Sequence, residues 1–180
     1  MKKTFLVLTV LFLSFSTVDA QDWTKYKSED LAFVATFPKE PKRTVQKVNT
    51  AVGELDMHMI MHAPVEGDDN AIYSIIRSDY PEAQFKDADD DYNSGVLDGA
   101  VEGAVKNVQG KLVYDNKVKF NGYPGRSIKI KMQDGFIYIN AYLVENPMFI
   151  TQVICLTDKD KNASIQRFLN SFEIIKTKQN

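Results

Sequence analysis

The chain has 180 residues and a formal net charge of −2 at pH 7, a size typical of one domain and a charge that argues against general nucleic-acid binding. It contains one cysteine, Cys155, so an intrachain disulfide is impossible and the fold must be stabilised by its core.

The first twenty residues have the three parts of a secretory signal peptide. Lys2 and Lys3 form a basic start, and a mostly apolar run follows at residues 5–15. Val18 and Ala20 are the small residues that a signal peptidase needs near its cleavage site. We therefore expect cleavage after Ala20.

The apolar run is too short to remain as a membrane anchor, because a spanning helix needs roughly 20 apolar residues. Gln21, and not a cysteine, follows the predicted cut, so bacterial-type lipid modification is not expected. We predict a signal peptide at residues 1–20 and one mature domain at 21–180, located in the periplasm or secreted. No stable membrane insertion is expected.

Alternating apolar and polar residues predict four strands first, at residues 31–37, 43–50, 55–62 and 72–79. In the third strand, Met57, Met59 and Met61 share one face. We expect these methionines to fill the core, since methionine is a common core residue. Binding of Cu(I) stays open as an alternative, because thioethers suit this soft ion.

The two histidines of the chain, His58 and His62, share the other face of the same strand with Asp56. Four residues of extended chain separate the histidines by roughly 14 Å, so one metal ion cannot bind both. We expect Asp56 and His58 to be a solvated pair, and assign no metal site.

A helix is expected to begin in the acidic cluster at residues 87–91, whose carboxylates suit the positive end of a helix dipole. The spacing of Asp87, Asp89 and Asp91 is also found in calcium loops, but Tyr92 stands where such a loop needs glycine. The stripe that faces the sheet is Leu97, Ala100, Val101, Ala104, Val105 and Val108.

Three glycines, Gly95, Gly99 and Gly103, are spaced four apart inside this helix and face away from the predicted core. Each costs about 1 kcal/mol of helix stability relative to alanine. The glycines therefore indicate either a weak helix or a surface on which another backbone comes close, as in a dimer or a partner complex.

Strands at residues 111–120 and 126–132 are expected to form a hairpin through residues 121–122. A two-residue turn would pair Leu112 with Lys131 and so place an apolar and a charged side chain on the same face of the sheet. We therefore predict one extra residue in the loop, or a bulge at residues 124–125. The expected pairs are Leu112 with Met132, Tyr114 with Ile130 and Asn116 with Ile128.

The outward face of this hairpin is then expected to carry a stripe of lysines, in which Asp115 is the one acidic residue. A stripe of this kind either protects an edge strand from aggregation or steers an acidic partner or anionic lipid headgroups. The lysines are Lys111, Lys117, Lys119, Lys129 and Lys131.

The last strands are expected at residues 136–144 and 148–156, and both of their faces are largely apolar. They should therefore lie at the sheet centre, covered on both sides, with Ile139 and Val153 deeply buried. Cys155 lies in the second of them and is expected to be buried and inert. A second helix is expected to present Ile165, Phe168, Leu169 and Phe172 to the sheet.

Three segments resemble the PsbP-like and Mog-type group of domains: FVATFPKEP (residues 33–41), NGYPGR (121–126) and RFLNSFEI (167–174). By order of elements the resemblance spans residues 28–175. It implies an α+β sandwich with a central antiparallel sheet and helices packed on both faces. The family includes extrinsic photosystem subunits and a partner of a small GTPase, which implies binding roles without a shared active site.

The sequence contains no GxSxG, HExxH, CxxC, Walker or GxGxxG motif, so we assign no catalytic, cofactor or metal residue. We expect a non-enzymatic module of the bacterial cell envelope that binds another protein, or a second copy of itself, or stabilises an assembly. A small-molecule or metal binder that uses the pocket between the sheet and the first helix is the alternative, and an unrecognised hydrolase is a third class. A closed apolar cavity with converging polar groups would favour the small-molecule binder, and an exposed apolar patch the protein binder.

Overall fold

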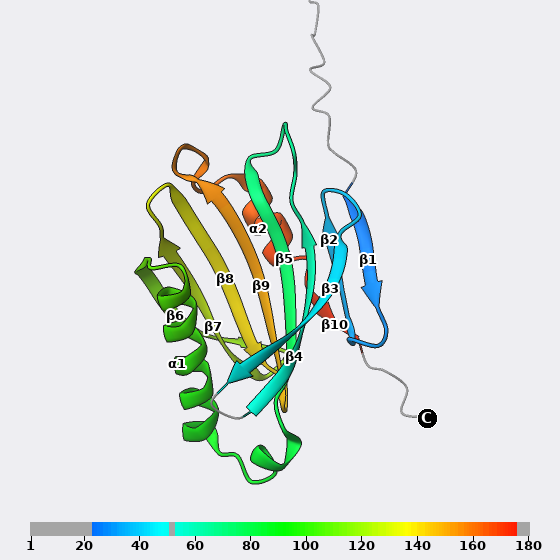
Figure 1. The fold of residues 1–180 in the computed structure, drawn as a ribbon, viewed down its shortest axis with the longest axis vertical. Coiled ribbons are helices and arrows are strands. Elements are labelled where there is room, and N and C mark those ends of the chain that lie inside the picture. The colour runs from blue at the N-terminus through cyan, green and yellow to red at the C-terminus, as the bar shows by residue number, and fades with distance from the viewer. Residues whose placement is uncertain (1–22, 51–52, 176–180) are drawn as a thin grey trace, which may run out of the picture.

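The computed structural model describes residues 23–50 and 53–175, so the predicted signal peptide and its cleavage site lie outside it. Within these residues a seven-stranded antiparallel sheet forms the body of the protein, in the order β3-β4-β5-β9-β8-β7-β6 (Figure 1). Its strands are β3 (Lys42–Thr50), β4 (Gly53–His62), β5 (Asn70–Asp79), β6 (Lys111–Phe120), β7 (Tyr123–Lys131), β8 (Gly135–Leu143) and β9 (Pro147–Leu156).

A small second sheet and a short helix cover one face of the large sheet. The small sheet has the order β1-β2-β10, and the helix is α2. An aromatic cluster fills the space between these layers and includes Phe33, Phe37, Tyr73, Phe149 and Phe168, all of them buried. The elements are β1 (Thr24–Ser28), β2 (Phe33–Phe37), β10 (Glu173–Ile174) and α2 (Ala163–Leu169).

The opposite face carries the long helix α1 (Asp90–Asn107), which packs chiefly against β7 and β8 (Figure 1). Leu97 and Val101 of α1 are buried in a cluster with Ile128, Ile130 and Ile139 of the sheet. Neither described α-helix has both the length and the apolar character that a bilayer crossing requires. The predicted α+β class, with an antiparallel sheet and a helix on each face, is therefore confirmed.

Both helices begin where a polar side chain satisfies their first backbone donors. Asp89 caps α1 by accepting a hydrogen bond of 2.8 Å from the backbone N–H of Tyr92, which confirms the helix start predicted in the acidic cluster. Asn162 caps α2 by accepting a hydrogen bond from Ile165. Phe172 lies beyond the end of α2, and it is nevertheless buried as predicted.

The prediction that two central strands are covered on both sides is right for β8 and only partly right for β9. Residues of β8 are buried on both faces, since α1 lies over one face and the aromatic cluster over the other. In β9, Val153 is fully buried, whereas Ile150 and Ile154 on the α1 side are only half-buried. The helix does not reach far enough across the sheet to cover them.

The predicted loop of the β6–β7 hairpin is wrong. Phe120 pairs with Tyr123, so the turn has two residues, and both Asn121 (φ 50°) and Gly122 (φ 89°) adopt the positive φ typical of tight hairpins. The extra residue lies near the far end of β6 instead, where the register shifts between Leu112 and Tyr114.

This shift pairs Leu112 with Ile130 and not with the predicted Met132. A bulge in the strand corrects the facing of Leu112 as effectively as a longer loop would, and it leaves the tight turn intact. Tyr114 pairs with Lys129, and Asn116 pairs with Ser127, in place of the predicted Ile130 and Ile128.

Truncation of the two predicted core residues tests the sheet centre. Ile139 is 5% and Val153 is 0% exposed, so we expect Ile139→Ala and Val153→Ala each to lower the free energy of unfolding by about 2–4 kcal/mol through lost burial and a residual cavity. Val45→Ala is the control, because Val45 is 52% exposed and should lose less than about 0.5 kcal/mol. Urea denaturation measures all three, and equal losses would contradict the assigned centre.

Candidate binding surfaces

The α1 side of the large sheet is apolar well beyond the strands that α1 covers. Met59, Ile76 and Ile150 occupy directly paired positions on β4, β5 and β9, and the row ends at Ala141 of β8. Paired residues share a sheet face, so the whole row faces the α1 side. Ala141, beneath α1, is buried, whereas the other three are half-buried. We call this half-covered region the open face; its apolar residues are Met57, Met59, Met61, Ile72, Ile76, Ile150 and Ile154.

A groove of about 380 Å³ runs where the open face meets α1. On the helix side it is lined by three small residues, Ala100, Gly103 and Ala104, together with Val101, Asn107 and Val108. No charged residue lines the groove, and Ser78, Asn107 and Gln152 are among its few polar members. Since several lining residues of the sheet remain half-exposed, the groove is continuous with the open face and is not an enclosed cavity.

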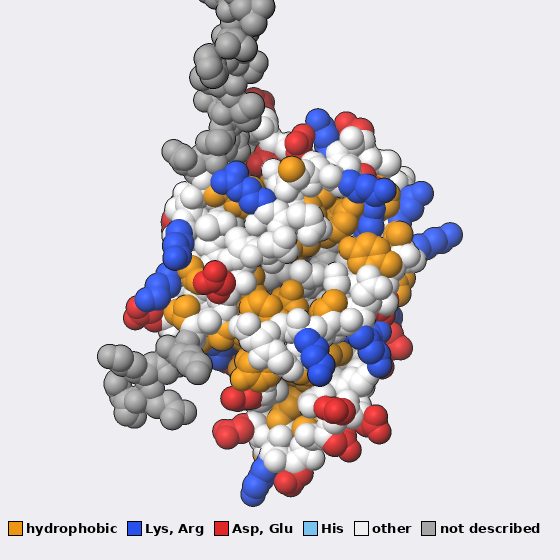
Figure 2. Space-filling view, turned by 180° about the vertical axis from the view of Figure 1, so that it is seen from behind, with side chains coloured by type: hydrophobic (Ala, Val, Ile, Leu, Met, Phe, Trp, Pro, Cys, Tyr) orange, Lys and Arg blue, Asp and Glu red, His pale blue; other side chains and the backbone are white. Residues whose placement is uncertain are grey.

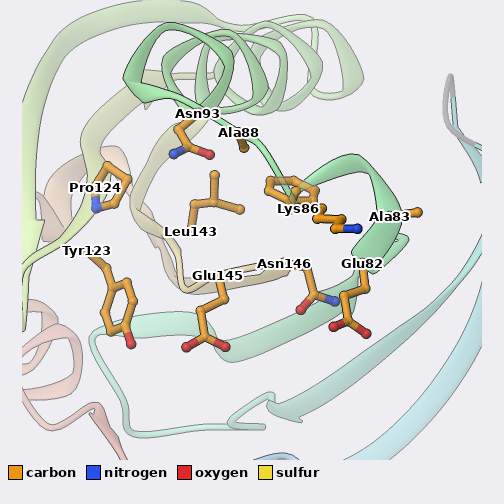
Figure 3. A pocket seen from close by; sticks show the side chains of 11 residues that line it. Glu82, Ala83, Lys86, Ala88, Asn93, Tyr123, Pro124, Leu143, Glu145 and Asn146 are labelled. Atoms are coloured by element: carbon orange, nitrogen blue, oxygen red, sulfur yellow. The ribbon is translucent and has the colours of Figure 1, made fainter.

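A second hollow, of about 610 Å³, lies at the lower end of the molecule in Figure 1. We call it the end cleft. It forms where the turn between β8 and β9, the turn between β6 and β7, and the segment leading into α1 come together. Figure 3 shows Leu143 in its middle with polar side chains around it; these include Glu82, Lys86, Asn93, Tyr123, Glu145 and Asn146.

Comparison with known proteins identifies the architecture. No protein-family model and no curated protein matches the chain. Among solved structures, the solution structure of cyanobacterial PsbP (CyanoP) from Synechocystis sp. PCC 6803 matches with a TM-score of 0.58 over 89% of this chain and 97% of that chain. The chain has the PsbP-like fold. The two sequences are 12% identical, so the similarity shows the fold alone and carries no site residue.

The PsbP-like fold splits the predicted lysine stripe between the two faces of the sheet. Lys117 and Lys119 pair with Arg126 and Pro124 and point to the α1 side. Lys111 and Lys131 pair with each other and point to the opposite side. The bulge near Val113 is the reason, because one extra residue reverses the facing of every later residue in β6.

Lys129 is the second correction, because it is buried and not part of an exposed stripe. Its ammonium donates hydrogen bonds of 2.8 Å to both carboxylate oxygens of Asp160 and lies 4.0 Å from the centre of the Phe136 ring. The hydroxyl of Tyr138 donates to the same carboxylate. This cluster is not evident from the sequence, since Asp160 lies on a loop after β9 and nothing in the local pattern links it to β7.

Of the three glycines of α1, Gly95 and Gly99 are exposed and face away from the sheet as predicted, whereas Gly103 is half-buried at the edge of the groove. A Cβ built on Gly95, Gly99 or Gly103 would meet nothing within 4 Å outside its own helical turn. Packing inside the described structure therefore gives no reason for glycine at these positions. Gly103 is also part of the groove wall, so the stripe borders the open face.

The methionines and histidines of β4 lie on opposite faces, as predicted. Met57 lines the groove. On the other face, His62 stacks on Tyr73 with ring centres 6.4 Å apart, and Nδ1 of His58 lies 3.3 Å from Nη2 of Arg43. No group of three or more His, Cys, Asp or Glu side chains in the described residues could hold a metal ion. Copper binding by the three methionines stays the alternative hypothesis to core packing.

Cys155 is buried in β9, as predicted. Burial raises the pKa of its thiol, with a further contribution from the nearby Asp160 carboxylate. A raised pKa disfavours the reactive thiolate, so a structural role is the better assignment.

The Lys129–Asp160 pair yields a pH-dependent prediction. Burial alone raises the pKa of Asp160, but hydrogen bonds from Lys129 and Tyr138 outweigh it and hold the pKa below its ordinary 3.8. A lowered carboxyl pKa stabilises the fold above that ordinary value, and this contribution is lost as the pH falls through the folded pKa. We expect Lys129→Met to cost roughly 3 kcal/mol near neutral pH and clearly less in acid, once the pH falls below the pKa of Asp160 in the folded protein.

Urea denaturation of the wild type and Lys129→Met at the two pH values measures this gap. The exposed Lys131→Met is the matched control, and it should leave stability within about 0.5 kcal/mol. A Lys129→Met gap that stays constant down to acid pH would show that the ion pair with Asp160 does not contribute.

The glycine stripe yields a second prediction. Because both added Cβ atoms meet open space, Gly99→Ala with Gly103→Ala should raise the free energy of unfolding by about 1–2 kcal/mol. If the stripe only weakens the helix, the double variant keeps its association state and partners. If another backbone contacts the stripe, the same variant melts higher but loses association. Thermal melting of the mature chain measures its stability, and sedimentation measures its association state. A lower melting temperature would contradict the open space found around Gly99 and Gly103.

Proposed function

We propose that the chain is an exported, non-enzymatic module of the bacterial cell envelope whose open face binds another protein or supports an assembly. The observation that carries this proposal is the uncharged groove beside a half-covered apolar sheet. A partly exposed apolar region of this kind favours a surface on which something binds. The signal-type N-terminus supports a location outside the cytoplasm.

The composition of the groove favours a protein surface over a small ligand. Small-molecule sites usually place several polar groups toward the ligand. Here the groove opens onto the sheet, and its polar members are neutral side chains such as Ser78 and Gln152. Gln152 already donates a hydrogen bond to Ser74, which leaves little polar specificity for a ligand.

The small residues on the wall favour a partner element that lies close to α1. Ala100, Gly103 and Ala104 project little from the helix, so a neighbouring backbone approaches closely there. Met57, which lines the groove, and Met59 on the adjoining open face are half-buried and supply flexible apolar contacts. Burial of this apolar area would contribute about 25 cal/mol for each Å² removed from water.

A charge placed in the open face tests the proposal. We expect Met59→Glu to abolish association with the native partner, because a carboxylate would be buried against an apolar surface. Val45→Glu is the matched control, since Val45 is exposed on the neighbouring strand and pairs with His58, which puts it on the opposite sheet face. The wild type and both variants are expressed with a C-terminal tag in the source cell, released from the envelope after cross-linking, and compared by mass spectrometry.

The wild type and Val45→Glu should retain the same cross-linked protein, and Met59→Glu should lose it while keeping its melting temperature within a few degrees. The recovered wild type should begin at Gln21, which intact mass reads directly. Retention of the same partner by Met59→Glu would contradict a binding role for the open face, and an uncleaved signal would contradict the proposed export.

A further inference from the structure

We propose that the end cleft is a separate binding site for an organic cation, a primary ammonium or guanidinium group carried on a short apolar stem. The cleft lies at the lower end of the sheet, away from the middle of the open face, so the inference does not depend on the function proposed above. Its volume of about 610 Å³ is within the range of small-molecule sites.

The floor of the cleft suits an apolar stem. Leu143 is 1% exposed and stands in the middle of the cleft, with Pro124 beside it (Figure 3). Phe85 adds an aromatic ring to the lining, held by edge contacts with Tyr80 and Tyr92 at 5.9 and 5.4 Å between ring centres. A short alkyl chain would therefore find apolar contacts on more than one side.

One wall of the cleft is a row of hydrogen-bond acceptors. Figure 3 shows Asn146 between Glu145 and Glu82. The amide nitrogen of Asn146 donates a hydrogen bond of 2.8 Å to the backbone carbonyl of Tyr80, which leaves its oxygen as a free acceptor. The described residues provide no hydrogen bond or ion pair to either carboxylate, so this row can take its donors from a ligand.

The charges around the cleft also favour a cation. Lys86 is the one basic residue in the lining, against the two glutamates. Acidic side chains gather at the same end of the molecule (Figure 2), and the segment leading into α1 contributes Asp87, Asp89 and Asp90, all exposed. A concentration of negative charge beside a cleft attracts positively charged ligands.

A bare metal ion fits the cleft less well than an organic cation. Divalent ions need several oxygen ligands converging on one point. The described residues contain no group of three or more His, Cys, Asp or Glu side chains that could hold such an ion. The acceptors are instead spread along one wall above an apolar floor, an arrangement that matches a donor group on a stem.

Two sources could supply this chemistry, a free alkyl diamine and a lysine side chain of another protein. Both are tested on the mature, isotope-labelled chain by NMR titration, which locates weak binding by its shifted amide signals. The probes are 1,5-diaminopentane, the peptide acetyl-Gly-Lys-Gly-amide, and 1-pentanol, which has the stem without the charge. We expect both cations, but not pentanol, to shift signals of residues 82–86 and 143–146. The probe that binds more tightly indicates whether the natural ligand is a free diamine or a lysine side chain.

Charge variants give the decisive pattern. Glu145→Gln and Glu82→Gln should each weaken cation binding roughly tenfold, since a charge-assisted hydrogen bond is lost. Lys86→Gln should strengthen it a few-fold, because a repelling charge is removed. Glu102→Gln is the matched control, as Glu102 is an exposed glutamate of α1 that does not line the cleft, and it should change nothing.

The proposal is overturned if neither cation shifts these signals at millimolar concentration, or if pentanol shifts them equally. It is also overturned if Glu102→Gln weakens binding as much as Glu145→Gln, because attraction would then come from overall charge. Folding of each variant is read from the same spectra. The Met59→Glu variant should bind the cations normally, so failure at the open face and failure at the end cleft remain distinguishable.

Discussion

One helix cannot cover a seven-stranded sheet. Strands lie about 4.8 Å apart, so the sheet is about 29 Å wide, whereas a helix with its side chains is about 10 Å across. α1 therefore covers the part of the sheet formed by β7 and β8 and leaves β4, β5 and β9 half-covered. Most side chains of those strands on the α1 side are nevertheless apolar. The open face is this apolar surface that the helix leaves half-covered.

Over its central strands, the other face of the sheet has no such mismatch between the sheet and its cover. There the small sheet and α2 act together as a wider cover, and large aromatic side chains such as Phe33, Phe168 and Phe172 fill the space beneath them. The buried Lys129–Asp160 pair closes the same layer beside β8, with Tyr138 and Phe136 around it. The two faces therefore differ. The face under the small sheet and α2 contains most of the aromatic core, and the α1 face leaves apolar surface accessible.

Local patterns in the sequence predict most of the elements but few of the distances between them. Alternation locates the strands, and the aspartates before α1 mark its start, because both depend on neighbouring residues. The bulge near Val113 could not be located, since a bulge in the strand and a longer loop correct the facing of Leu112 equally well. β1 and β10 are not evident from alternation, because β1 is polar and lysine-rich and β10 has only two residues.

The candidate sites were harder to predict for a related reason. The apolar character of Ile150 and Ile154 is evident in the sequence, but how far α1 reaches across the sheet is not. The partner of Lys129 lies 31 residues further along the chain, and the end cleft needs two turns and the segment before α1 to meet. The glycine stripe was identified because helical spacing is a local property, and its position beside the groove required the fold.

If the open face binds a partner, that face is covered when the protein is in its native assembly. Methionine oxidation by dilute peroxide tests it directly, because exposed thioethers oxidise faster than buried ones. In the isolated mature protein, the half-buried Met57, Met59 and Met61 should oxidise faster than Met148, which is 3% exposed. In intact cells treated before extraction, we expect the oxidation of all three to slow to the rate of Met148. Equally fast oxidation in intact cells and in the isolated protein would contradict a covered open face.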